Sequence, residues 1–141
     1  MRLMALKVLV YSDDALTRQR VILALGRRPH PSLGEVEYVE VATAPIVTQN
    51  VDAGIIDLAI LDGEAAPAGG LGVAKSLKDE VADCPPILVL TGRPQDAWLG
   101  VWSEADAILS RPIDPIELAT IATQLLRNRI EAKSAPKAIG A

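Results

Sequence analysis

The chain has 141 residues, of which half are hydrophobic and 3% aromatic, and its formal net charge is −4. This length favours one domain with a real core, and no apolar run is long enough to cross a bilayer, so we expect no membrane insertion. The acidic balance and scarce aromatic residues argue against direct binding of nucleic acid. The single cysteine, Cys84, excludes an internal disulfide and a cysteine-based metal cluster. The opening MRLMALK is too short and too weakly apolar for a signal peptide, so we expect a cytoplasmic protein that starts at Met1 or Met4.

The first strand and helix follow from an apolar run and the polar residues after it. Residues 6–11 are rich in valine and predict a strand, and the SDD that follows is typical of a helix N-cap. We predict a helix over Ala15–Leu25 that ends at Gly26. Its buried face is expected to carry four apolar residues: Leu16, Ile22, Leu23 and Leu25.

The next strand is less apolar than the first. Glu37 and Glu40 interrupt residues 35–42, and such charges discourage pairing with another chain, so we expect an edge strand. A helix is predicted over Thr43–Ala53, with Val47 and Val51 on its buried face, and Gly54 ends it.

The stretch from Ile56 to Leu77 organises the rest of the chain. An uninterrupted apolar run, LAIL, leads into Asp62, which favours a strand in the centre of a parallel sheet covered on both faces. A loop with Pro67 follows, and then a helix near residues 71–82 whose buried face carries Ala74, Leu77 and Val81.

The last third repeats the pattern of strand and helix. Strands are predicted at residues 87–90 and 107–109, a helix at residues 94–104, and a final helix from Pro115, capped by Asp114. The buried face of that helix carries Leu118, Ile121, Ala122 and Leu125. Five strands that alternate with five helices predict an α/β fold with a doubly wound parallel sheet. We assign this domain to residues 1–130 and a frayed or disordered tail to residues 131–141, which leaves no room for an output domain.

Polar residues stand at the carboxyl ends of the predicted strands, where ligand chemistry gathers in such folds. They are Asp13 and Asp14, then Asp62, then Thr91, then Ser110, Arg111 and Pro112. Close carboxylates repel unless a cation lies between them, so oxygen ligands at this edge favour Mg²⁺ or a similar hard ion. Such a metal could offset charge on a phosphoryl group attacked by an Asp oxygen, while Thr91 and Arg111 contact other phosphoryl oxygens.

In this order the residues resemble the receiver domain of bacterial two-component response regulators. The segments that carry the resemblance are VLVYSDD, DLAILD, PAGGLGVAKSL, PPILVLTG and AILSRPIDPIEL, which together span about residues 6–130. The resemblance implies a flavodoxin-like (βα)5 fold with strand order 2-1-3-4-5. It also implies signalling through a partner protein.

The resemblance assigns roles residue by residue. Asp62 matches the phospho-accepting aspartate, and Asp13, Asp62 and the backbone carbonyl of Glu64 match the Mg²⁺ ligands. Thr91 matches the switch hydroxyl. Arg111 and Pro112 stand in place of a Lys-Pro pair that usually follows a cis peptide bond, so we expect one here.

Four positions depart from the receiver pattern. An alignment without gaps puts Ser12 where the first of two paired acids normally stands, although a gap would restore Asp13 and Asp14 as the pair. Pro67 comes one position late in the loop. Arg111 replaces a lysine and is planar and wider than an ammonium group, and Ile108 replaces an aromatic switch residue. These departures affect the phosphorylation switch and not the fold.

Each candidate residue also has a structural interpretation. Asp62 could cap a helix or loop, and Asp13 and Asp14 could cap the first helix. Arg111 could pair with Asp62 and fill the metal position, which would make an inactive site. Trp98 and Trp102 lie four residues apart on the helix at 94–104, where they either cover the sheet edge or anchor an interface. Receivers meet partners, and each other as homodimers, through the face of the fourth helix, fifth strand and fifth helix.

Three hypotheses follow from these observations. The first is a stand-alone, atypical receiver that binds a partner protein and is switched by phosphorylation of Asp62 from a histidine kinase; its variant is an adaptor that needs no phosphorylation. The second is a small Mg²⁺-dependent phosphatase or phosphotransferase that uses Asp62, although no general acid or substrate pocket is evident and we expect no enzyme and no catalytic residue. The third, flavin or nucleotide binding, is disfavoured because SDD after the first strand would repel phosphate.

Overall fold

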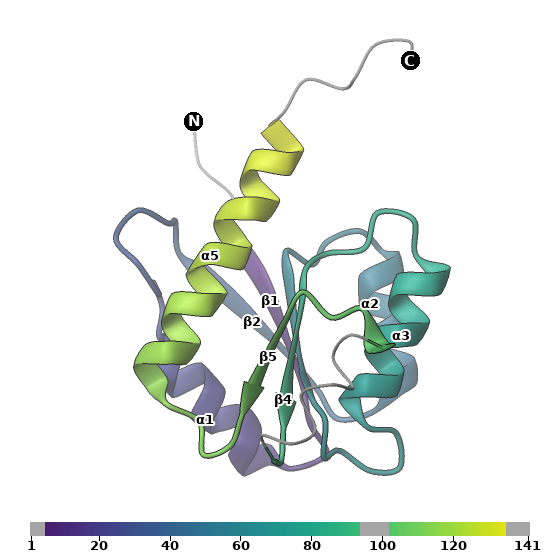
Figure 1. Ribbon diagram of the computed structural model, residues 1–141. Helices are drawn as coiled ribbons and strands as arrows, with labels where there is room; N and C mark the ends of the chain where they lie inside the picture. The colour runs from purple at the N-terminus through teal and green to yellow at the C-terminus, as the bar shows by residue number, and fades with distance from the viewer. Residues whose placement is uncertain (1–4, 94–101, 135–141) are drawn as a thin grey trace, which may run out of the picture.

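The computed structural model describes residues 5–93 and 102–134, and its centre is one five-stranded parallel sheet (Figure 1). The strands are β1 (Leu6–Tyr11), β2 (Val36–Val41), β3 (Leu58–Asp62), β4 (Ile87–Thr91) and β5 (Ala107–Ser110). They lie in the order β2-β1-β3-β4-β5, and each neighbouring pair is parallel. The predicted strand order is confirmed, and β2 lies at an edge as expected.

Helices cover both faces of this sheet (Figure 1). One face is covered by α1 (Ala15–Leu25) and α5 (Pro115–Ser134), and the other by α2 (Ala44–Asp52) and α3 (Gly70–Glu80). The predicted start of the tail at residue 131 is wrong, because α5 continues to Ser134. The helix predicted at 94–104, including Trp98, lies mostly outside the described residues.

The core has two halves because successive strand residues point to opposite faces of the sheet. Val8, Ile60 and Leu88 pack toward α1 and α5, whereas Leu9, Leu61 and Val89 pack toward α2 and α3. Every residue of β3 and β4 is buried, as expected for strands covered on both sides. The two central strands therefore end at an edge that the packed core holds in place.

The prediction for the buried face of α1 was wrong at two positions. Leu16 and Leu23 are 52% and 74% exposed, while Thr17, Val21 and Leu25 are buried. A spacing of seven residues does put Leu16 and Leu23 on one side of the helix. The side that faces the sheet is a different one, and it carries the row Thr17, Val21 and Leu25, in which neighbours are four residues apart. This error leaves two large apolar side chains on the surface of the molecule.

Candidate functional site

The carboxyl ends of β1, β3 and β5 bring two side chains and a backbone N–H together around one carboxylate. Asp62, the last residue of β3, is 3% exposed. Its Oδ2 accepts a hydrogen bond from Ser12 Oγ at 2.8 Å, and its Oδ1 accepts from the backbone N–H of Glu64 at 2.9 Å and from Arg111 Nη2 at 2.8 Å. A buried carboxylate needs such partners, because it has lost its hydration. Both oxygens of Asp62 are thus engaged.

Ser12 faces Asp62 because it directly follows β1, which pairs in parallel with β3. It is fully buried, and its Oγ also accepts a hydrogen bond from Asp14 N at 3.0 Å. The geometry therefore agrees with the alignment without gaps, in which Ser12 stands where receivers usually have an acid. No acidic side chain takes that inward position from the SDD segment.

The two acids that follow Ser12 are both exposed. Asp14 accepts hydrogen bonds from Leu16 N and Thr17 Oγ1, both at 3.0 Å, and thereby caps α1. These two hydrogen bonds, in that order, lower the pKa of Asp14 below its usual value. Asp13 is exposed. Its negative charge still reaches Tyr11, whose pKa is raised mainly by burial and then by Asp13 and Asp62.

Thr91 lies at the end of β4 but points to a neighbour that the sequence did not suggest. Its Oγ1 lies 3.1 Å from Ser110 Oγ, its register partner on β5. Next to it, the side chain of Glu64 lies so close to Gly92 that a Cβ there would overlap with Oε1 of Glu64. Ser110 was noted only as part of a strand end, and its role as the hydrogen-bond partner of Thr91 depends on the register of two strands.

Two glycines allow the backbone to close around Asp62. A Cβ on Gly70, the first residue of α3, would stand 2.8 Å from the carbonyl carbon of Asp62, and one on Gly63 would stand 2.7 Å from the carbonyl oxygen of Leu90. Only glycine fits such close approaches. The signal for both was present in the sequence, as a glycine directly after the strand and another at the helix start, but we had not assigned it.

Arg111 follows β5 and provides the positive charge of the site. Its side chain is 28% exposed, and its Nε is buried without a hydrogen-bond partner. The backbone N–H of Arg111 donates to Thr91 O at 2.9 Å, which fixes the residue beside β4. The peptide bond between Arg111 and Pro112 is cis, as the resemblance implied, and so is the bond before Pro67.

The arrangement around Asp62 does not fit Mg²⁺, the ion that receiver domains typically hold at this place. A Mg²⁺ site needs several oxygen ligands with free lone pairs in octahedral geometry. Here Asp62 accepts three hydrogen bonds, one of them from the hydroxyl of Ser12, and Asp13 is exposed. Within residues 5–93 and 102–134 no group of three or more His, Cys, Asp or Glu residues could hold a metal ion. The guanidinium of Arg111 supplies the positive charge instead.

Of the two tryptophans proposed for a partner face, the structure describes one. Trp102 is 53% exposed, which is large for an aromatic side chain. Trp98 lies outside the described residues. No helix in the described part of the chain is long and apolar enough to cross a membrane.

No family model matches the chain. Two curated proteins from two strains of Mycobacterium tuberculosis, both named response regulatory proteins, are 61% identical over 123 residues, which is 87% of this chain and 92% of theirs. The similarity thus covers nearly the whole of both chains.

Solved structures resemble the fold at low sequence identity. The receiver domain of an HD domain-containing protein from Pseudomonas fluorescens has a TM-score of 0.76 and 18% identity over 96% of this chain and 97% of its own. The receiver domain of a NarL regulator from M. tuberculosis has a TM-score of 0.70 and 20% identity over 89% of this chain and 98% of its own. These likenesses show the fold, and the identity of the curated relatives shows the family.

Proposed function

The chain belongs to the response regulators of two-component signalling, and we propose that this receiver domain binds a partner protein without phosphorylation of Asp62. One observation carries the proposal: both oxygens of the buried Asp62 carboxylate accept hydrogen bonds, and one of the donors is the guanidinium of Arg111. To attack a phosphoryl donor, an Asp oxygen must give up hydrogen bonds, and the site must then neutralise the phosphoryl oxygens. Arg111 already neutralises Asp62 itself.

The switched alternative keeps Asp62 as the phospho-acceptor, with Mg²⁺ and a histidine kinase as its requirements. The position of Asp62 at the end of a buried central strand, with Thr91 on the neighbouring strand, supports this alternative. The two versions differ in whether Ser12 and Arg111 prevent phosphoryl transfer. They can be separated by changing these two residues back to the usual receiver pattern.

The test is incubation with acetyl phosphate and Mg²⁺, followed by Phos-tag electrophoresis and intact-mass spectrometry. We expect no phosphorylation of the native chain and clear phosphorylation of the double variant Ser12→Asp/Arg111→Lys, because it gains a second acid and a compact cation. Adding Asp62→Asn to the double variant should abolish the modification. Phosphorylation of the native chain at Asp62 would overturn the proposal in favour of the switch.

We propose that the partner surface includes Trp102 and the edge strand β5. A half-exposed tryptophan covers a large apolar area and is a strong interface anchor. The partner is either another protein or a second copy of this chain. Receiver domains are generally not enzymes, and we expect none of the described acids to turn over a substrate. As in response regulators generally, we expect the protein in the cytoplasm.

Analytical ultracentrifugation of the native chain and of Trp102→Ala tests the homodimer. If this surface joins two copies, the native chain sediments as a dimer and Trp102→Ala as a monomer. Ile46→Ala is the matched control, since Ile46 is also exposed, at 42%, but lies on α2. If the native chain is a monomer, the partner is a different protein. Constitutive binding would then be supported if that protein still bound the Asp62→Asn variant but no longer bound Trp102→Ala.

A further inference from the structure

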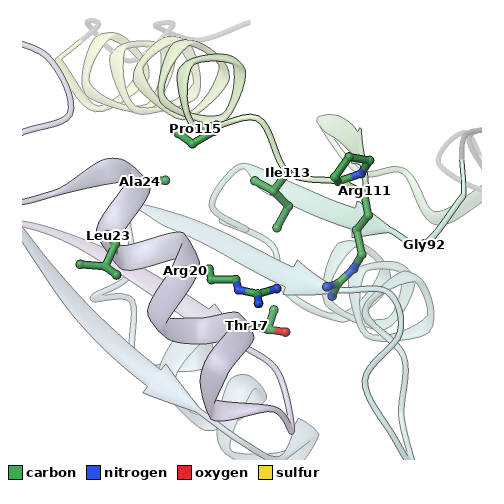
Figure 2. A pocket seen from close by; sticks show the side chains of 9 residues that line it. Thr17, Arg20, Leu23, Ala24, Gly92, Arg111, Ile113 and Pro115 are labelled. Atoms are coloured by element: carbon green, nitrogen blue, oxygen red, sulfur yellow. The ribbon is translucent and has the colours of Figure 1, made fainter.

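A pocket of about 900 Å³ lies between α1 and the connection from β5 to α5 (Figure 2). Its described lining includes Thr17, Arg20, Leu23, Ala24, Arg111 and Ile113. Pockets for small molecules have volumes of about 300 to 1,000 Å³ and combine apolar walls with a few placed polar groups. This pocket matches that description in size and in composition.

The apolar wall of the pocket explains the exposed leucine on α1. Leu23 is 74% exposed, and it shares the pocket with Ala24, Ile113 and Pro115. Figure 2 shows Leu23 on α1 and Ile113 on the segment that leads from Arg111 to Pro115. A ligand with an apolar body would remove this surface from water, which is favourable. In contrast, Leu16 on the same helix is exposed but does not line the pocket.

Two arginines bring positive charge to the pocket. Arg20 comes from α1 and Arg111 from the end of β5, and Figure 2 shows both guanidinium groups at the end of the pocket near Thr17. The two hydrogen bonds to Asp14 lower its pKa most, and the positive charges of Arg20 and Arg111 lower it further. Among the described lining residues none is acidic. Arg20 is exposed and forms no ion pair with a described residue, whereas Arg111 is paired through Nη2 with Asp62.

We propose that this pocket binds a small amphipathic anion, whose carboxylate or phosphate head contacts Arg20 and Arg111 and whose apolar body covers Leu23 and Ile113. Asp62 compensates the charge of Arg111 only, so the charge of Arg20 at this end of the pocket is left for an anion, and guanidinium forks match carboxylate and phosphate oxygens. The proposal does not depend on whether Asp62 is phosphorylated. Its failure would leave the proposed function unchanged.

The test uses four probes with the same ten-carbon chain, each below its micelle concentration. Decanoate and decyl phosphate carry the two anionic heads, decanol is neutral, and decyltrimethylammonium is cationic. Isothermal titration calorimetry and ¹⁵N–¹H NMR shifts should report saturable binding of at least one anion, with the shifts centred on α1 and residues 111–115. The neutral and cationic probes should bind at least about tenfold more weakly, because they cannot pair with the arginines. Equal binding of all probes, or saturable binding of none, would overturn the proposal.

Two pairs of variants locate the binding on the pocket. Arg20→Ala should weaken the bound anion about tenfold, whereas Arg28→Ala, at an exposed arginine outside the pocket, should leave its affinity unchanged. Leu23→Ala should lower the affinity for the anion about fivefold, and Leu16→Ala should not change it. Arg111 is left intact because it also holds Asp62. If the control variants weakened binding as much as the pocket variants, the anion would bind elsewhere and the proposal would fail.

Discussion

The two ends of the sheet use carboxylates in different ways. At the amino end, Asp57 and Asp106 each join two strands: Asp57 N donates to Lys7 O and Lys7 N donates to Asp57 Oδ2, at 2.8 and 2.9 Å. Asp106 repeats this pattern with Ile87, at 2.8 and 2.7 Å. Each acid also meets a lysine, Lys133 or Lys78, that comes from the surface. At the carboxyl end, Asp62 instead links residues that follow β1 and β5 around one buried charge.

The difference in burial decides what each carboxylate contributes. The side chains of Asp57 and Asp106 are 13% and 36% exposed, so water shares in compensating their charge, while the side chain of Asp62 is 4% exposed. A buried ion pair contributes little net stability, yet removal of one partner leaves an uncompensated charge at high cost. Asp62 and Arg111 therefore depend on each other, whereas the acids at the amino end act as separate strand clamps.

The largest expected effect comes from breaking the buried pair. Arg111→Ala should lower the free energy of unfolding by about 3 kcal/mol, because the charge of Asp62 then lacks its cation. Chemical denaturation in urea at pH 7 measures this loss. The double variant Arg111→Ala/Asp62→Asn should recover much of it, since the buried charge is gone. Additive losses in the double variant would show that Arg111 and Asp62 do not act as a pair.

Smaller losses are expected at the amino end. Asp57→Ala and Asp106→Ala should each lower the free energy of unfolding by about 1 kcal/mol, the cost of one hydrogen bond to a backbone N–H with a partly exposed cation. Because Lys133 is half exposed, part of the Asp57 effect should fade in 1 M salt. Urea denaturation at two salt concentrations measures both. Losses equal to that of Arg111→Ala would remove the distinction between the two ends.

The sequence predicted the sheet well because its information is local. The central strands are short apolar runs bounded by polar residues, and their burial on both faces follows directly from that pattern. Leu16 and Leu23 were placed wrongly because spacing along a helix shows which residues share a side but not which side meets the sheet. Here the small residue Thr17, rather than a leucine, begins the buried row.

The site was harder to predict than the fold because its contacts join distant strands. The sequence offered two alignments at the end of β1, and only the packing of the strand ends shows that Ser12 rather than Asp13 faces Asp62. The contact between Thr91 and Ser110 likewise depends on the register of β4 and β5. The sequence was compatible both with an ion pair between Arg111 and Asp62 and with a metal site. Only the side-chain geometry shows the ion pair.

The smallest expected effect is at Asp14, an exposed carboxylate that also accepts a backbone hydrogen bond. The hydrogen bond from Leu16 N, followed by that from Thr17, holds the pKa of Asp14 below its usual 3.8 in the folded state. Its contribution to stability is therefore present above pH 3.8 and is lost as the pH falls through the lower folded pKa.

Asn also caps a helix but does not titrate, so the stability difference between the native chain and Asp14→Asn should shift in favour of Asn as the solution is acidified. Urea denaturation between neutral and strongly acid pH measures this shift. Parallel pH profiles for the two proteins would mean that the cap does not depend on the charge of Asp14. The buried pair at Asp62 differs, because there the removal of the partner charge alone is expected to destabilise the fold.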